Sequence, residues 1–110
     1  MSQPSLDLLQ GTLDLLVLRC LVLGPMHGYG ISSAIRERTG GEIDVVDAAL
    51  YKALYRLERD DLLVATWGVS DNNRRAKYYT LGAAGRRRLR EEEARWRRYS
   101  AAVDRLLKPA

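Results

Sequence analysis

Apolar residues recur at helical spacing in three segments of the first half of the chain. In residues 12–23, 29–38 and 47–61 they lie three or four positions apart, which is the spacing of one helical face. In residues 12–23 they extend around most of the helix, so we expect this helix to be central and buried. The third segment has a narrower apolar stripe, formed by Leu50, Leu54 and Leu57.

Local signals predict where these helices begin and end. Thr12 and Asp47 can accept hydrogen bonds from the first-turn N–H groups, so both are expected to be N-caps. The pairs Gly24-Pro25 and Gly40-Gly41 break helices, and they end the first and the second.

The pattern changes after the third helix. Residues 63–69 and 77–81 are rich in β-branched and aromatic side chains and flank the turn-forming residues 70–73. They predict a β-hairpin with a basic tip and a basic return strand.

The last segment, residues 83–107, is a long helix with a heptad pattern that Glu92 interrupts. Its apolar positions are Leu89, Trp96, Tyr99, Val103 and Leu106. Such a stripe is a solubility liability on a monomer, so we expect it to form a homodimer. The alternative is that the helix folds back on its own domain, partly covered by Leu6, Leu8 and Leu9.

The order of these elements defines the fold class. Three compact helices and a hairpin are typical of a winged helix-turn-helix, whose third helix enters the major groove of DNA. We therefore predict a mainly α protein with a β-hairpin, an α+β fold. Residues 1–81 would form the winged helix-turn-helix DNA-binding domain and residues 82–110 the C-terminal dimerisation helix.

Charge is distributed unevenly along the 110 residues. The net charge is +4, yet residues 1–85 hold nine Lys/Arg and ten Asp/Glu, and residues 86–110 hold nine and four. If the first part binds nucleic acid, its cations must gather on one face.

Several functional classes are excluded or disfavoured. One Cys (Cys20) and one His (His27) cannot build a zinc site, and the chain has no phosphate loop or catalytic triad. We therefore expect no enzyme, no metal and no cofactor. No apolar run reaches 18 residues and residues 1–7 do not resemble a secretory signal, so we expect neither a membrane span nor export. The lone cysteine fits a reducing compartment.

The cations do gather in two places. We expect the third helix to contact DNA on the side opposite its leucines, through Lys52, Tyr55, Arg56 and Arg59, with Tyr51 contacting a phosphate from the flank. The hairpin would contact the DNA backbone or minor groove through Asn73, Arg74, Arg75 and Lys77. Alternatively, the two tyrosines are packing residues, and Arg56 or Arg59 pairs with Glu58, Asp60 or another acid. A protein-interaction module and an RNA-binding protein are the rival functions.

The sequence resembles the PadR family of transcriptional regulators over nearly its whole length. The motifs that carry this resemblance are, in order, Gly11-Thr12-Leu13-Asp14-Leu15-Leu16, Gly24-Pro25-Met26-His27-Gly28-Tyr29-Gly30, Leu50-Tyr51 with Ala53-Leu54 and Arg56-Leu57-Glu58, Trp67-Gly68, Arg74-Arg75-Ala76-Lys77-Tyr78-Tyr79, and Leu81 with Ala84-Gly85. The resemblance implies a cytoplasmic homodimer, commonly a repressor, that can be released by a small molecule or by stress. The single short C-terminal helix resembles the smaller subgroup of the family.

Three positions depart from the family pattern. Ala48-Ala49 replace the usual Gly-Ser or Gly-Thr, Lys52 replaces a proline, and Asp61 replaces the usual glycine before the first wing strand. The fold and DNA binding tolerate these changes, but the operator sequence need not match that of relatives.

Dimerisation has two consequences for the partners. A two-fold dimer presents its recognition helices to half-sites about 34–36 Å apart, so the operator is expected to be pseudo-palindromic. Trp96 and its mate could clamp a small planar aromatic effector. The alternative is that Trp96 is a core residue of the dimer interface.

Overall fold

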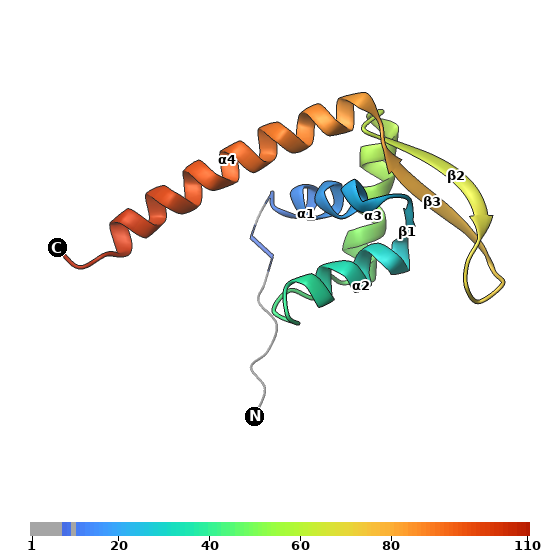
Figure 1. Cartoon of the computed structure of the whole chain (residues 1–110), viewed down its shortest axis with the longest axis horizontal. Helices are drawn as coiled ribbons and strands as arrows, with labels where there is room; N and C mark the ends of the chain where they lie inside the picture. Colours follow the sequence, from blue (N-terminus) through green and yellow to red (C-terminus); the bar gives the residue numbers. More distant parts are fainter. Residues whose placement is uncertain (1–7, 10) are drawn as a thin grey trace.

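The computed structural model describes residues 8, 9 and 11–110. The elements are α1 (Leu13–Cys20), the 3-10 turn η1 (Leu21–Leu23), β1 (Met26–His27), α2 (Gly28–Arg38), α3 (Asp47–Arg59), β2 (Leu63–Val69), β3 (Arg75–Leu81) and α4 (Ala83–Leu107). Figure 1 shows α1–α3 gathered into a head from which the β2–β3 hairpin and α4 extend in opposite directions. This confirms the predicted α+β winged-helix fold with its long C-terminal helix. No helix among the described residues is long and apolar enough to cross a membrane.

The leucine stripe of α3 lies at the centre of the core. Its three leucines are completely buried, as the sequence predicted. They belong to one cluster with Val17 and Leu18 of α1 and with Ile31 and Ile35 of α2. Burial of apolar surface on this scale is the main stabilising contribution to a domain of this size.

The hairpin belongs to a three-stranded antiparallel sheet in the order β1-β3-β2. The short strand β1 was not predicted, because two residues are too few to show an alternating pattern. It pairs Met26 with Tyr79 and His27 with Tyr78. His27 also caps α2, because its Nδ1 atom accepts a hydrogen bond from the N–H of Gly30 at 2.9 Å. The start of α2 is therefore attached to the hairpin.

Several predicted boundaries and caps were wrong. The first helix becomes the 3-10 turn η1 after Cys20, and β3 begins at Arg75 rather than at residue 77, because Arg75 pairs with Val69. Thr12 does occupy the N-cap position, but its hydroxyl donates to the carbonyl of Leu9 at 2.7 Å and caps no N–H. Asp47 is the first residue of α3, and Val46 takes the cap position.

The C-terminus of α3 explains one departure from the family pattern. The helix ends at Arg59, two residues earlier than predicted, and Asp61 adopts a left-handed conformation with φ 61°. The N–H of Leu62 donates to the carbonyl of Leu57 at 2.9 Å, and the N–H of Asp61 donates to that of Glu58 at 3.0 Å. These two bonds form a Schellman motif, in which glycine is preferred at the position of Asp61. An aspartate here is mildly strained.

The base of α4 is fixed against the loop that follows α3. The N–H of Gly82 donates to the carbonyl of Leu62 at 3.1 Å, and a Cβ atom at Gly85 would collide with the same carbonyl oxygen. Glycine at position 85 is therefore required by a close approach. Further along, Leu89 is buried, and Arg19 of α1 pairs with Glu93 at 3.3 Å.

The outer half of α4 leaves the head (Figure 1). Trp96 is 39% exposed, Tyr99 62% and Leu106 84%, whereas Val103 is half-buried. The alternative that the last helix folds back on its own domain therefore holds for the first part of α4, but not for its outer half. Leu8 packs against the core and Leu9 lies near Tyr99, whereas Leu6 lies outside the described residues.

Candidate nucleic-acid interface

The side of α3 opposite the leucines is exposed. Lys52, Tyr55 and Arg59 lie on it, and Tyr55 is 68% exposed, so this tyrosine is not a core residue. Among the described residues, Arg59 pairs with its exposed neighbour Asp60 at 3.2 Å, and such surface pairs contribute little. Lys52 forms no ion pair within the part of the chain that the structure describes. This face is available to a partner.

Arg56 has a different environment. Its two terminal nitrogens donate to the two carboxylate oxygens of Asp14 at 2.7 and 2.9 Å. The hydrogen bond to Asp14 raises the pKa of Arg56 above its ordinary value. The ion-pair alternative therefore holds for Arg56, with Asp14 as its partner rather than Glu58 or Asp60. Arg56 ties α3 to α1, and its guanidinium is not a free cation at the exposed face.

Tyr51 is partly a packing residue. A Cβ atom at Gly28 would lie 2.7 Å from the Tyr51 ring, so the ring lies directly against the first residue of α2. The side chain nevertheless remains 52% exposed. Tyr51 therefore combines a packing contact with an accessible edge beside the hairpin.

One face of the hairpin carries alternating aromatic and cationic residues. Tyr79, Lys77, Trp67 and Arg75 lie on this face, because Lys77 is opposite Trp67 in the β2–β3 register, and Tyr79 and Arg75 are each two residues from Lys77. The Nζ atom of Lys77 pairs with Glu58 of α3 at 2.7 Å, which raises the pKa of Lys77. Lys77 therefore attaches the hairpin to α3. Farther out, the Arg75 guanidinium lies 4.6 Å from the centre of the Trp67 ring.

The hairpin tip is formed by a turn of residues 70–74. The N–H of Asn73 donates to the carbonyl of Ser70 at 2.9 Å, and that of Ser70 donates to Arg74 at 2.8 Å. Asn73 has φ 58°, a conformation that asparagine adopts more readily than most residues. Asn73 thus shapes the turn that presents Arg74, whose side chain is exposed.

A groove of about 820 Å³ separates the hairpin from the starts of α2 and α3. It brings together four of the predicted residues, Tyr51, Arg74, Arg75 and Lys77. The other ring-bearing residues that line it were not among the predicted contacts: His27, Tyr29, Trp67 and Tyr79. The exposed-face position of Trp67 could have been inferred from strand alternation. The sequence gives no signal that His27 and Tyr29 lie beside the hairpin.

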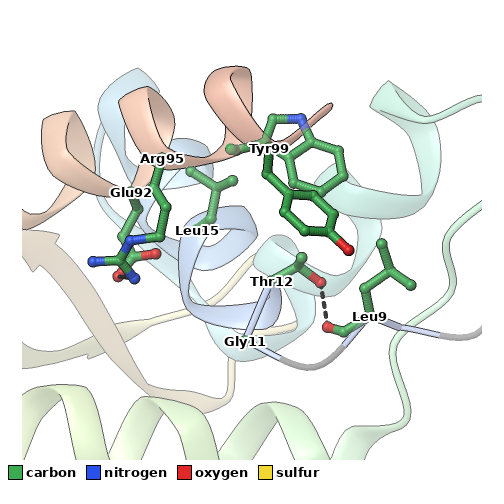
Figure 2. A pocket seen from close by; sticks show the side chains of 8 residues that line it. Leu9, Gly11, Thr12, Leu15, Glu92, Arg95 and Tyr99 are labelled. Atoms are coloured by element: carbon green, nitrogen blue, oxygen red, sulfur yellow. Dashed lines mark hydrogen bonds and ion pairs between the residues drawn. The ribbon is translucent and has the colours of Figure 1, made fainter. Parts of the chain in front are cut away.

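A second hollow, of about 400 Å³, lies between the start of α1 and the outer half of α4 (Figure 2). Its lining is mostly apolar and includes Leu15, Trp96 and Tyr99, with Glu92 and Arg95 at one side. The Trp96 and Tyr99 rings are stacked, with centroids 6.4 Å apart and an interplanar angle of 29°. Figure 2 shows Tyr99 reaching from α4 toward Leu9 and Thr12. The hollow therefore lies between the head and the helix that is predicted to form the dimer.

Nothing in the described residues resembles a metal or redox site. No group of three or more His, Cys, Asp or Glu side chains is positioned to hold a metal there. Cys20 is buried in the core, and burial raises the pKa of its thiol. A protonated, inaccessible thiol reacts slowly, so Cys20 is a packing residue in this structure.

Known proteins with the same arrangement identify the family. Residues 17–91 match the transcriptional regulator PadR-like family. An uncharacterized protein X of Lysinibacillus sphaericus is 33% identical over 99 residues, which cover 89% of this chain and 90% of that one. A PadR family transcriptional regulator from Eggerthella lenta is 33% identical, with a TM-score of 0.77 over 92% of this chain and 86% of its own. Bacillus subtilis PadR in complex with operator DNA shares the fold at 24% identity, with a TM-score of 0.65 over 73% and 46% of the two chains. The family match spans most of the head and the base of α4, and this chain therefore belongs to the PadR-like family of transcriptional regulators.

Proposed function

We propose that this protein is a sequence-specific DNA-binding repressor that acts as a homodimer on a pseudo-palindromic operator. The observation that carries the proposal is the exposed, basic and aromatic side of α3 together with the basic hairpin, which Tyr51 of α3 faces across an open groove. In winged helix-turn-helix proteins these two elements bind adjacent parts of one DNA site. The similarity in fold to the Bacillus subtilis PadR that was solved with operator DNA supports the same mode of binding.

The free side chains define the proposed contacts. Lys52, Tyr55 and Arg59 would enter the major groove, where Lys and Arg can bond guanine. Arg74 and Arg75 would contact phosphates, with Tyr51 at the groove wall and Asn73 shaping the tip. Arg56 and Lys77 would act indirectly, because their ion pairs fix α3 to α1 and to the hairpin.

The outer half of α4 would form the dimer. Its exposed apolar residues continue the heptad positions of the buried Leu89, so pairing with a second copy extends an existing packing stripe. The dimer would place two α3 helices on successive major-groove half-sites. Because its target is chromosomal DNA, we expect the protein to act in the cytoplasm.

An effector would bind in the hollow between α1 and α4. Its apolar lining and the stacked rings of Trp96 and Tyr99 suit a small planar aromatic molecule. Asp14, the partner of Arg56, directly precedes Leu15 of the hollow, so an effector there would act beside the contact that positions α3. The chain has two tryptophans, so Trp67→Phe leaves Trp96 as the sole tryptophan, whose emission can be excited selectively at wavelengths that tyrosine does not absorb. Saturable quenching by planar cationic or phenolic compounds is expected, and an unchanged spectrum across such a panel would leave Trp96 as an interface core residue.

The central experiment measures binding to the DNA upstream of the protein's own gene by fluorescence anisotropy at several salt concentrations. The test variant is Lys52→Ala/Arg74→Ala, with one change on α3 and one at the hairpin tip. The matched control is Arg90→Ala/Arg98→Ala, which removes the same charge from exposed positions of α4. The wild-type complex should resist competitor DNA and weaken steeply with salt, because phosphate contacts release counterions.

The test variant and the control variant should then differ in DNA affinity. Loss of a phosphate contact makes the plot of log K against log salt shallower, by about 1 in the magnitude of its slope. Loss of a base contact also relaxes the preference for one DNA sequence. The control should bind as the wild type does. Equal weakening of both variants would instead indicate a general charge effect. If no DNA complex forms at any salt concentration, the result would favour the alternative that the protein is a protein-interaction module.

A further inference from the structure

Trp67 is an exposed aromatic residue whose presence is not explained by packing in the core. It lies in β2, its side chain is 60% exposed, and it faces the groove beside α3. A large apolar side chain in this position gains little from burial, so its role must be sought in its neighbours. Its principal neighbour is the Arg75 guanidinium, 4.6 Å from the ring centre.

The two residues form the outer part of a graded series along one face of the hairpin. At the inner end Tyr79 is buried, and the Nζ atom of Lys77 lies 5.8 Å from its ring centre. Lys77 is fixed to α3 by Glu58, and Trp67 is its cross-strand neighbour. Arg75 is the last cation of the series, and no acid pairs with it within the described residues. Its position relative to α3 therefore depends on Trp67.

We propose that Trp67 is a positioning residue that holds Arg75 for contact with a phosphate of the DNA strand that crosses this groove. The inference rests on the proposed DNA-binding function. Stacking uses the flat face of a guanidinium and leaves the N–H donors at its edge free for a phosphate. An arginine that is already ordered also loses less side-chain entropy when DNA binds. In this proposal Trp67 contributes to DNA affinity through Arg75 and makes no contact with DNA of its own.

The test is a double-mutant cycle on DNA affinity with Trp67→Ala, Arg75→Ala and the double variant. A cation–π contact at an exposed site corresponds to about a two- to fivefold change, so Trp67→Ala should weaken binding by about that factor. Arg75→Ala should weaken it at least as much. In the Arg75→Ala background, Trp67→Ala should have no further effect. Trp67→Phe retains an aromatic face and should restore most of the affinity.

A second measurement needs no DNA. In a Trp96→Phe background Trp67 is the sole tryptophan, and Arg75→Ala should increase its quenching by acrylamide, because the guanidinium no longer covers the ring. Unfolding temperatures and circular dichroism of all variants report any loss of the fold.

The outcomes distinguish failure of the proposed DNA-binding function from failure of the positioning role of Trp67. If the wild type binds no DNA, the proposed function fails, while increased quenching would still support the Trp67–Arg75 stack. If the wild type binds and the two losses in affinity multiply in the double variant, Trp67 acts independently of Arg75 and the positioning role is overturned. Unchanged quenching in Arg75→Ala would overturn it too, because the stack would then be absent in solution.

Discussion

The helices α3 and α4 both carry an apolar stripe, but the described residues cover the stripe of α3 completely and that of α4 only at its base. The leucines of α3 are completely buried, whereas Tyr99 and Leu106 of α4 are mostly exposed. Both helices have a polar opposite side and neither is an unusual sequence for an amphipathic helix. Burial therefore depends on what the rest of the chain can supply. The other helices of the head cover the apolar side of α3, whereas the outer half of α4 extends beyond the head.

This difference separates two uses of the same pattern. The stripe of α3 stabilises the fold and fixes the orientation of the helix that would read DNA. The outer stripe of α4 contributes less to the isolated chain, because much of its apolar surface, above all at Leu106, remains in water. We infer that it contributes on assembly instead. Substitutions on the two stripes test this contrast directly.

Leu54→Ala should destabilise the head most. Leu54 is completely buried at the centre of the core, and removing such a side chain leaves a cavity. We expect the free energy of unfolding to fall by about 2–5 kcal/mol, measured by urea denaturation. Lys52→Ala, on the exposed side of the same helix, should change it by about 0.5 kcal/mol or less. Similar losses in the two variants would contradict the assignment of the buried face.

Leu106→Asp should act on assembly rather than on the fold. Leu106 is exposed in the single chain, so the change costs little there, but a dimer would lose its burial. That burial corresponds to about 1.5–3 kcal/mol per leucine, which raises the dimer dissociation constant at least tenfold. Sedimentation at graded concentrations measures it. Ala101→Asp places the same charge on an exposed position away from the stripe and should leave the dimer intact; a monomeric wild type would refute the role given to α4.

Asp61→Gly should stabilise the protein. Asp61 has φ 61° in the turn that ends α3, and glycine adopts this conformation without a Cβ penalty. Allowing for the greater freedom of glycine in the unfolded chain, we expect a gain of about 0.5–1 kcal/mol. Asp60→Gly is the matched control, because Asp60 has φ −87° and should lose stability on the same change. Thermal unfolding of both variants checks the sign, and parallel shifts would contradict it.

Alkaline pH should weaken the head through Cys20. Burial raises the pKa of Cys20 above its ordinary value of 9.0, so the native state retains its proton when the unfolded chain loses one. The stabilising contribution is therefore complete below about pH 9 and is lost as pH rises toward the native pKa. Cys20→Ala should show a flatter decline in unfolding free energy between pH 8 and pH 10. Identical slopes would mean that the thiol is not buried in solution.

The sequence was a sufficient guide wherever side-chain spacing alone determined the structure. The α3 stripe, the hairpin and the bounds of α4 follow from local periodicity, and the structure confirms them. What periodicity could not predict are contacts between distant segments. The pairing of Arg56 with Asp14 joins residues 42 positions apart, and β1 exists only because β3 lies beside it. These contacts decide which cations are free, so the candidate site was predicted less completely than the fold.

The close approach at Gly85 sets the geometry with which two heads would meet DNA. Gly85 lies in the first turn of α4, a helix of 25 residues that is about 37 Å long at a rise of about 1.5 Å per residue. A tilt of about 5° at its base would displace its far end by about 3 Å, which is nearly one base-pair step. In an assembly held together by the outer half of α4, the close contact that glycine permits at position 85 would therefore help to set the distance between the two recognition helices, and with it the operator spacing that a dimer accepts.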